Sequence, residues 1–432
     1  MGAPGLLNGR SINTAPRAAG QAPRAPLRAG RGARNLAPMQ TLAQSPTDPA
    51  FVQDPYPFYD RARAAGPIFH WAEYGMPAAV AHAAVNAILR DRRMGRADPN
   101  PAPVPDHLAP FYAIEAHSML ELEPPRHTRL RGLVLRAFTQ RRIAALAPEI
   151  AALAHTLIDG LPAGGAFDLL PGFASRLPVI IIARLLGVPE AMADALLGWS
   201  HAMVGMYQAG RSRADEDRAA AAAAEFADFL RAHIEARRSR PADDLLTHLI
   251  AAEEDGTRLS PDEMIATCIL LLNAGHEATV HTLGNGIKAM IEARIPPAAL
   301  APDRIERTVE EVLRFDAPLH LFTRFVYEDV EVMGHVLPAG SRVACLLGAA
   351  NRDPRAFDAP HRFDPDRAGP AHVSFGAGLH FCIGAPLARL ELQVALPVLW
   401  ARLPGLRLAD RPRYADIYHF HGLERLMVSA RP

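Results

Sequence analysis

The chain has little lysine, little cysteine and no long apolar run. Lys288 is the single lysine among 46 basic residues, which we interpret as compositional bias. The cysteines are Cys268, Cys345 and Cys382, and the absence of CxxC spacing argues against a disulfide scaffold or a structural zinc site. Such unpaired thiols are typical of a reducing compartment, so we expect a cytoplasmic protein. No apolar run reaches about 18 residues, so we predict no membrane span.

The charges balance, with 46 basic and 46 acidic residues. A formal net charge of zero gives no general attraction to polyanions, so we do not expect nucleic acid as a partner. Hydrophobic residues make up 49% of the 432 residues, which is ordinary globular composition. We predict a single domain over residues 41–432.

The first 38 residues differ from the rest because they hold six arginines and no acid, and are rich in Gly, Ala and Pro. Such a segment cannot bury enough apolar surface to fold. We therefore predict a disordered extension over residues 1–40. Two alternatives are an organelle transit peptide, which is also arginine-rich and acid-poor, and a true start at Met39.

Helical periodicity dominates the chain. We expect helices at 58–65, 81–91, 127–138, 142–160, 172–186, 190–208, 213–238, 261–293, 303–315 and from about Pro386. Strands are expected at 68–71 and 78–80 and within 322–334 and 341–348, and proline-rich loops at 97–113 and 351–372. The helix at 261–293 would be roughly 50 Å long at about 1.5 Å per residue. The pattern predicts a mainly α fold with a minor β-rich part and one traversing helix.

Cys382 lies in a glycine-rich segment, "FGAGLHFCIGAPL", just ahead of a predicted helix. Pro386 suits a first helical turn, and the positive end of a helix favours a thiolate. A phosphate-binding loop is excluded because no Lys-Ser/Thr follows the glycines. Two interpretations stay open at this point: a nucleophile with His380 as its base, or a metal ligand whose metal has its other ligands in a macrocycle.

The spacing of Phe375, Gly378, Cys382 and Gly384 resembles the haem-binding loop of the cytochrome P450 family. The resemblance implies haem b with Cys382 as its iron ligand, and Phe375, Gly376 and Ala274 at the cofactor. It implies that family's triangular helical prism with a minor β-rich domain and a long central helix. It also implies a monooxygenase that inserts one atom of O2 into a small, mainly apolar substrate.

Two more segments match the family. Glu311 and Arg314 in "TVEEVLRF" share a helical face, which alone predicts only a solvated ion pair. The resemblance implies a structural pair that braces the cysteine loop, with Arg362 as its third member.

The segment "PPRHTRLRGLVLRAFTQRR" places His127 and Arg131 on one helical face. The resemblance implies that these two residues, with Arg324 and His380, bind the haem propionates. The other arginines of the segment are interpreted as a basic solvent face, also suited to docking an acidic redox partner; they are Arg126, Arg129, Arg136, Arg141 and Arg142.

The long helix carries "NAGHEATVH", in which Ala274-Gly275 predicts a bulky neighbour or a helical bulge. It resembles the family's A-G-x-[D/E]-T segment, whose acid and alcohol relay protons during oxygen activation. Glu277 matches the acid, but Ala278 stands where the threonine is expected. Thr279 follows about 100° further around the helix, so we expect its hydroxyl to point elsewhere. A substrate hydroxyl or an ordered water would then replace it.

The resemblance implies O2, a separate ferredoxin-type donor with a reductase supplied by NAD(P)H, a monomer, and no fused reductase or membrane anchor. Ala278 keeps peroxide release or peroxide-driven, dehydration or rearrangement chemistry open, and a non-catalytic haem sensor is a further alternative. We expect the substrate pocket to be built from 97–113, 185–210, Asn273-Ala274 and 319–323, with His320 and Asn273 as its polar groups. Terpenoid, fatty acid, aromatic and polyketide substrates all stay open.

Overall fold

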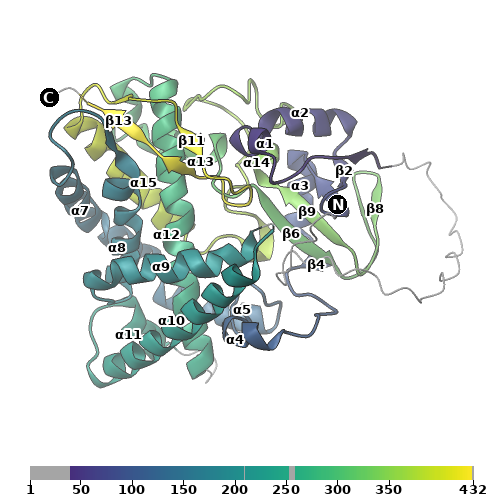
Figure 1. The fold of residues 1–432 in the computed structure, drawn as a ribbon, viewed down its shortest axis with the longest axis horizontal. Helices are drawn as coiled ribbons and strands as arrows, with labels where there is room; N and C mark the ends of the chain where they lie inside the picture. Colours follow the sequence, from purple (N-terminus) through teal and green to yellow (C-terminus); the bar gives the residue numbers. More distant parts are fainter. Residues whose placement is uncertain (1–38, 209, 253–257, 431–432) are drawn as a thin grey trace, which may run out of the picture.

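The computed structural model describes residues 39–208, 210–252 and 258–430. The helices are α1 Pro49–Gln53, α2 Tyr56–Ala65, α3 His82–Arg90, α4 Ala109–Glu115, α5 Arg126–Ala137, α6 Gln140–Ala145, α7 Ala147–Asp159, α8 Arg176–Leu185, α9 Ala193–Val204, α10 Arg213–Ser239, α11 Leu245–Ala251, α12 Pro261–Glu292, α13 Ile305–Phe315, α14 Leu347–Ala350 and α15 Ala385–Arg402. Most of the helices form one large body, and a smaller body of strands lies beside it (Figure 1). The expectation for residues 1–40 falls almost wholly outside the described residues.

The strands form one six-stranded sheet and three small ones. The main sheet has the order β1-β2-β3-β9-β6-β4, and the others are β10-β13-β5, β11-β12 and β7-β8. Their bounds are β1 Thr41–Leu42, β2 Ile68–Trp71, β3 Met76–Ala79, β4 Met94–Gly95, β5 Phe167–Asp168, β6 Leu321–Val326, β7 Val330–Val332, β8 His335–Leu337, β9 Arg342–Leu346, β10 Arg407–Leu408, β11 Arg413–Tyr414, β12 Leu423–Arg425 and β13 Met427–Ser429. The β6–β9 pair is antiparallel and sets Arg324 opposite Val343.

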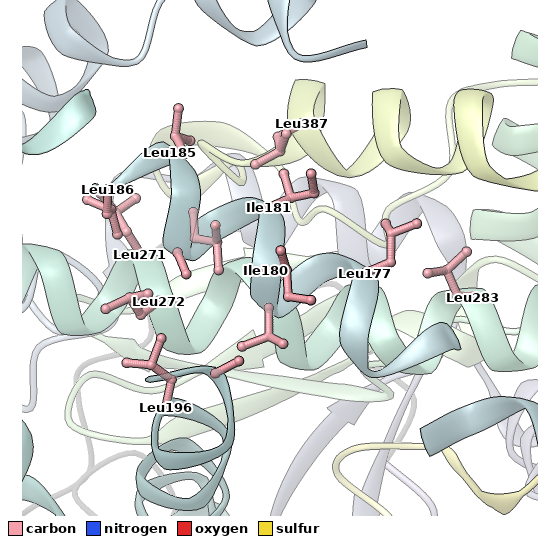
Figure 2. Close-up of a cluster of buried hydrophobic side chains, with 14 of the residues drawn as sticks. Leu177, Ile180, Ile181, Leu185, Leu186, Leu196, Leu271, Leu272, Leu283 and Leu387 are labelled. Carbon is pink, nitrogen blue, oxygen red and sulfur yellow. The ribbon is translucent and has the colours of Figure 1, made fainter. Parts of the chain in front are cut away.

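The central helix α12 begins at a strong N-terminal signal. Ser260 caps it, Glu263 completes a capping box, and Pro261 occupies the first turn. Leucines of α12 pack with Leu177, Ile180 and Ile181 of α8, and Leu387 of α15 joins the same apolar cluster (Figure 2). This burial holds α12 between the other helices, so its middle can form one wall of a site.

The predicted crowding at Gly275 is present, and α12 is continuous there. A Cβ on Gly275 would lie 2.9 Å from Cγ1 of Ile182 in α8. Glycine therefore permits the close approach of two helices, and a larger residue would push α8 away.

Three local predictions were wrong. Residues 97–113 were expected to be a loop, but α4 begins at Ala109, where Pro110 suits a first turn. The expected helix 142–160 is two helices, because Pro148 fits only the start of a new one. The short helix α11, which Asp244 caps, was not predicted. Among the described residues, no helix is both long and apolar enough to cross a membrane.

Candidate active site

The cysteine loop is a tight turn that leads into α15. Gly376 and Gly378 have φ of +69°, where only glycine is unstrained, and a Cβ on Gly378 would collide with the carbonyl oxygen of Leu89. The backbone N–H of Cys382 donates to the carbonyl of Phe375 at 3.0 Å. Burial raises the pKa of the Cys382 thiol, while N–H groups of Gly384 and Ala385 and the charge of Arg131 oppose that rise. A bound metal would deprotonate such a thiol outright.

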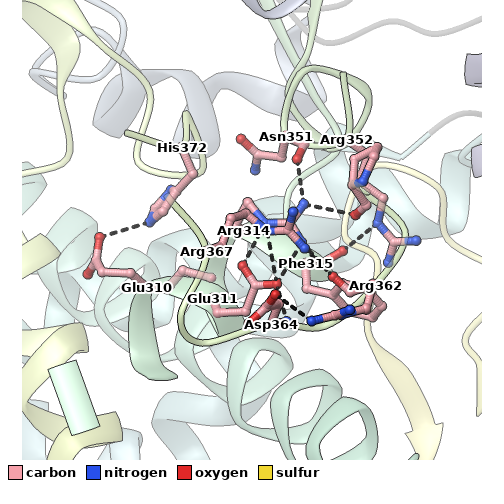
Figure 3. A network of polar contacts seen from close by, with 12 residues as sticks. Glu310, Glu311, Arg314, Phe315, Asn351, Arg352, Arg362, Asp364, Arg367 and His372 are labelled. Atoms are coloured by element: carbon pink, nitrogen blue, oxygen red, sulfur yellow. Dashed lines mark hydrogen bonds and ion pairs between the residues drawn. The ribbon is translucent and has the colours of Figure 1, made fainter. Parts of the chain in front are cut away.

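A buried ion pair braces this loop from α13. Arg314 Nε donates to Glu311 Oε2 at 2.7 Å and its Nη2 donates to Oε1 at 2.8 Å (Figure 3). Its remaining donors reach the carbonyls of Asn351 and Pro360 at 2.8 and 3.0 Å. The Ser374 hydroxyl donates to the carbonyl of Leu313 at 2.7 Å, which ties the cysteine loop to α13. Each nitrogen of the Arg314 guanidinium therefore donates at least one hydrogen bond.

The side chain that joins Glu311 and Arg314 as the third member of this network is that of Arg367, so the prediction of Arg362 was wrong. The Arg362 side chain is exposed and pairs with Asp364 at 2.8 Å, while its backbone carbonyl accepts from Arg314. Arg367 Nε lies 3.5 Å from Glu311 Oε1, and the N–H of Asp364 donates to the same oxygen at 2.7 Å. The segment 361–367 is irregular, so residue spacing could not show which arginine turns inward.

A second set of basic groups surrounds the cavity above the cysteine and lacks acidic partners. Arg131 of α5 and Arg324 of β6 form no ion pair with any residue that the structure describes, and both line the cavity. Burial lowers the pKa of Arg324 to about 10, with Arg96 adding to the effect. His127 is buried, and its Nδ1 has no hydrogen-bond partner among the described residues. His380 differs, because its Nε2 lies 2.9 Å from Oε1 of Glu123.

The middle of α12 forms the opposite wall. Ala274, Ala278 and Thr279 line the cavity together with Glu277. The Thr279 hydroxyl lies 3.3 Å from the carbonyl of Gly275, one turn earlier, and donates to it. That bond occupies the hydroxyl hydrogen, while Ala278 offers none. The Glu277 carboxyl accepts from the Ser200 hydroxyl of α9 at 3.1 Å.

The cavity between these walls has a volume of about 300 Å³. Its apolar lining includes Phe111, Ile269, Leu319, Leu321 and Phe322. All four expected wall segments contribute residues to the lining, among them Phe111, Met203, Asn273 and Leu319. His419 and Phe420 also line it and were missed, because they come from the far end of the chain.

His320 does not line the cavity, so its prediction as a pocket group was wrong. It is fully buried behind the wall, where its Nδ1 lies 2.8 Å from the Tyr59 hydroxyl. Asp316, His320 and His421 lie close enough together to resemble a metal site. The cations Arg352 and Lys288 already act on Asp316, however, so a further cation is disfavoured there.

Comparison with known proteins places this geometry in a family. The family model described as cytochrome P450 matches residues 305–402. "Cytochrome P450 monooxygenase PikC" of Streptomyces venezuelae is 39% identical over 84% of this chain and 87% of its own. "Vitamin D(3) 25-hydroxylase" of Pseudonocardia autotrophica is 39% identical over 88% of this chain and 95% of its own. The chain is a cytochrome P450.

The structural likeness agrees. The solved cytochrome P450 PksS of the bacillaene polyketide synthase, from Bacillus subtilis 168, superposes with a TM-score of 0.82 at 33% identity. The match covers 90% of this chain and 100% of the other. The predicted P450 fold, the haem cofactor and the monooxygenase class are therefore confirmed.

The residues of this chain fit a haem. The family's cofactor carries two propionates. The cavity offers Arg131 and Arg324, which form no ion pair with the described residues, and the Nδ1 of His127, which has no hydrogen-bond partner among them. Cys382 faces the same cavity from the loop. A cation as buried as Arg324 is costly without an ion pair, so an anionic ligand would stabilise it. The assignment of individual propionate contacts, that of His380 included, stays a prediction.

Proposed function

We propose that this cytochrome P450 hydroxylates a mid-sized, mainly apolar molecule at a carbon–hydrogen bond. The observation that carries the proposal is the cavity itself, which has Cys382 on one side, Ala274 to Thr279 on the other and apolar side chains between. A thiolate ligand favours O–O cleavage when haem is bound. The apolar walls orient the substrate and exclude bulk water, which limits side reactions.

One polar group in the wall narrows the substrate class. The amide nitrogen of Asn273 lies 3.7 Å from the sulfur of Met203, while its Oδ1 is buried and has no partner among the described residues. A substrate hydroxyl or N–H would satisfy that oxygen. The vitamin D(3) hydroxylase and the polyketide enzyme among the relatives have names consistent with large apolar substrates that carry few polar groups. We favour a sterol-like or polyketide-like substrate with at least one donor.

The electron source is proposed as a ferredoxin with its reductase and NAD(P)H. Arg126 and Arg136 of α5 and Arg141 of α6 are exposed, and Leu135 of α5 is 47% exposed. A basic face with an apolar centre suits an acidic electron carrier. A monomer in the cytoplasm stays a prediction of the sequence.

Reconstitution tests the proposal. Holoenzyme, a ferredoxin, its reductase and NAD(P)H are mixed with ligands selected by the change in haem absorption that follows binding. We expect ligand-dependent NAD(P)H consumption together with hydroxylated product. Product formed only with added peroxide would support the peroxide-driven alternative that Ala278 keeps open. Ligand binding without consumption of NAD(P)H or of added peroxide would contradict an oxygenase and favour a haem sensor.

A matched pair of ligands tests the role of Asn273. A hydroxylated ligand should bind about fivefold more tightly than its deoxy analogue, because a buried neutral hydrogen bond contributes on the order of 1 kcal/mol. Asn273→Leu should reduce that preference to near unity while leaving the binding of the deoxy analogue similar. An unchanged preference in the variant would assign recognition of the hydroxyl to another residue.

A further inference from the structure

Histidines from two helices surround the Glu277 carboxyl. Oε1 lies 3.3 Å from Nε2 of His201 in α9 and 3.5 Å from Nε2 of His276 in α12. Oε2 lies 3.9 Å from Nε2 of His281, one turn further along α12. Among the described residues, no arginine or lysine forms an ion pair with this carboxyl. Among those residues, the basic groups that face this carboxyl are therefore imidazoles.

The contact between His276 and Glu277 requires a proton. Nδ1 of His276 lies 2.7 Å from the carbonyl oxygen of Leu272, which can only accept, so Nδ1 carries a hydrogen. A neutral imidazole protonated at Nδ1 has a lone pair at Nε2. That nitrogen has no hydrogen-bond partner among the described residues and faces the carboxyl oxygen. Two lone pairs facing each other in a buried site repel, so the geometry calls for a hydrogen between them.

The histidines also favour the ionised form of the acid. Burial raises the pKa of Glu277, but the contact with His276 and the charges of His276, His201 and His281 outweigh it, so the pKa is lowered. The hydrogen between the two groups then belongs to His276. Burial lowers the pKa of His281, with Glu277 opposing it, and His281 also lies against Phe420 and His421 of the C-terminal loop. His281 is therefore a poor carrier.

His201 provides a route to solvent. Its side chain is 64% exposed, whereas those of His276 and Glu277 are 1% and 7% exposed. It thus bridges water and the buried carboxyl within hydrogen-bonding reach. The Ser200 hydroxyl holds the same carboxyl oxygen from the neighbouring position of α9.

We propose that His276 and Glu277 form a proton-holding pair for oxygen activation and that His201 reloads it from solvent. This inference rests on the proposed function. A proton passes from Nε2 of His276 to Oε1 of Glu277 and on into the cavity, and a proton from His201 replaces it. No electron moves in these steps, and the two protons that monooxygenation consumes come from water through His201. Because Ala278 has no hydroxyl to donate, we expect proton delivery to depend more on His276, Glu277 and His201 than it would with a threonine at position 278.

Infrared spectroscopy of the holoenzyme tests the pair without turnover. Glu277→Gln identifies the carboxyl band of Glu277 by difference. In His276→Gln the imidazolium is lost while burial persists, so Glu277 should become protonated at a pH higher by about one unit or more. His248→Gln is the matched control, because His248 of α11 pairs with Asp243 and does not line the cavity. An unshifted Glu277 in His276→Gln would overturn the pair.

Kinetics test the reloading step. His201→Gln should slow product formation about three- to tenfold and increase the solvent isotope effect, because a relay member is lost while Glu277 stays. Added imidazole should restore part of the rate, and His248→Gln should behave as the wild type. Equal rates and isotope effects in the two variants would contradict entry through His201. A shifted Glu277 in a protein that forms no product would contradict the proposed function and leave the pair supported.

Discussion

Arg314 and Arg324 lie ten residues apart and are buried to the same degree, yet their surroundings are opposite. They are 3% and 2% exposed. Arg314 donates to both oxygens of Glu311 and to loop carbonyls. Among the residues that the structure describes, Arg324 donates only to the carbonyl of its neighbour Thr323, at 2.8 Å. The guanidinium of Arg314 is hydrogen-bonded within the protein at each of its nitrogens. The guanidinium of Arg324 forms no ion pair with the described residues and lies at the cavity wall.

This difference separates structural charges from ligand-binding charges. Desolvation penalises both arginines, but only Arg314 recovers that cost within the chain. The cost at Arg324 is visible in its pKa, which burial and Arg96 lower to about 10. A buried arginine at a cavity wall that forms no ion pair with the described residues thus predicts an anionic ligand, which we expect to be a haem propionate.

The largest expected effect comes from removing Arg314 from its hydrogen-bonded pair with Glu311. Arg314→Met leaves Glu311 buried beside fewer donors and should lower the free energy of unfolding by about 3 kcal/mol or more. The cysteine loop loses its brace, so haem incorporation should fall as well. Denaturant unfolding of the apoprotein and holoprotein measures both. Arg362→Met is the control, with a change within about 0.5 kcal/mol, because its side chain is 72% exposed. Equal losses in the two variants would contradict the brace.

Arg324→Leu should give the opposite pattern. The apoprotein should be as stable as the wild type or more stable, since an unpaired buried charge is removed. Haem should dissociate about 10- to 100-fold faster, because a charge-assisted bond worth about 1.5–3 kcal/mol is lost. Transfer of haem to an apoglobin measures the rate.

Arg342→Leu is a matched control for that experiment. Arg342 is also buried with free Nη1 and Nη2 atoms, and burial lowers its pKa to about 10, but it does not line the cavity. Its loss should leave haem dissociation unchanged. Faster dissociation in both variants would assign the effect to general loosening of the sheet.

Local spacing predicted the parts of the site that regular elements carry. The i,i+3 pair of Glu311 and Arg314 and the segment at Ala274 to Thr279 depend only on helical geometry, so the sequence was enough. The sequence indicated Arg362 where the structure has Arg367, because both lie in an irregular loop and no periodicity there determines which side chain points inward. His419 and Phe420 reach the cavity through a bridge between Leu319 and Phe420, which is a tertiary contact.

His320 shows where the sequence held an unused signal. Leu319 and Leu321 line the cavity, and side chains alternate along an extended chain, so His320 had to face away. Its partners there, Tyr59 and Tyr418, come from opposite ends of the sequence. Alternation therefore predicted the direction, but not the network that receives the imidazole.

His421 shares one property with each of these arginines. Like Arg314 it lies beside an acid, 3.5 Å from Asp316, and like Arg324 it has a lowered pKa. Burial lowers its pKa to about 4, with Asp316 opposing and Lys288 and Arg352 adding to the shift. An unfolded histidine titrates near about 6.5, so between about pH 6.5 and 4 the unfolded chain binds more protons. Stability should therefore fall with falling pH, by about 1.4 kcal/mol per unit for this residue.

His421→Gln should remove that contribution. Denaturant unfolding at pH 7 and pH 5 should show a smaller loss of stability in the variant than in the wild type. A loss of equal size would mean that His421 takes up a proton in the folded protein, and that Asp316 then satisfies it much as Glu311 satisfies Arg314.

The smallest expected effect concerns the hydroxyl group that is absent at Ala278. Ala278→Thr adds a hydroxyl to the cavity wall one residue from Glu277, and Ala278→Val adds nearly the same volume without a donor. If proton supply is limited by the absent hydroxyl, the threonine variant should form several-fold more product per NAD(P)H, with less peroxide released, because a positioned donor favours productive proton transfer. The valine variant should match the wild type or fall below it. Equal coupling in all three proteins would mean that Ala278 does not limit proton supply, and that a substrate hydroxyl, an ordered water or the histidine-backed Glu277 carboxyl already meets the need.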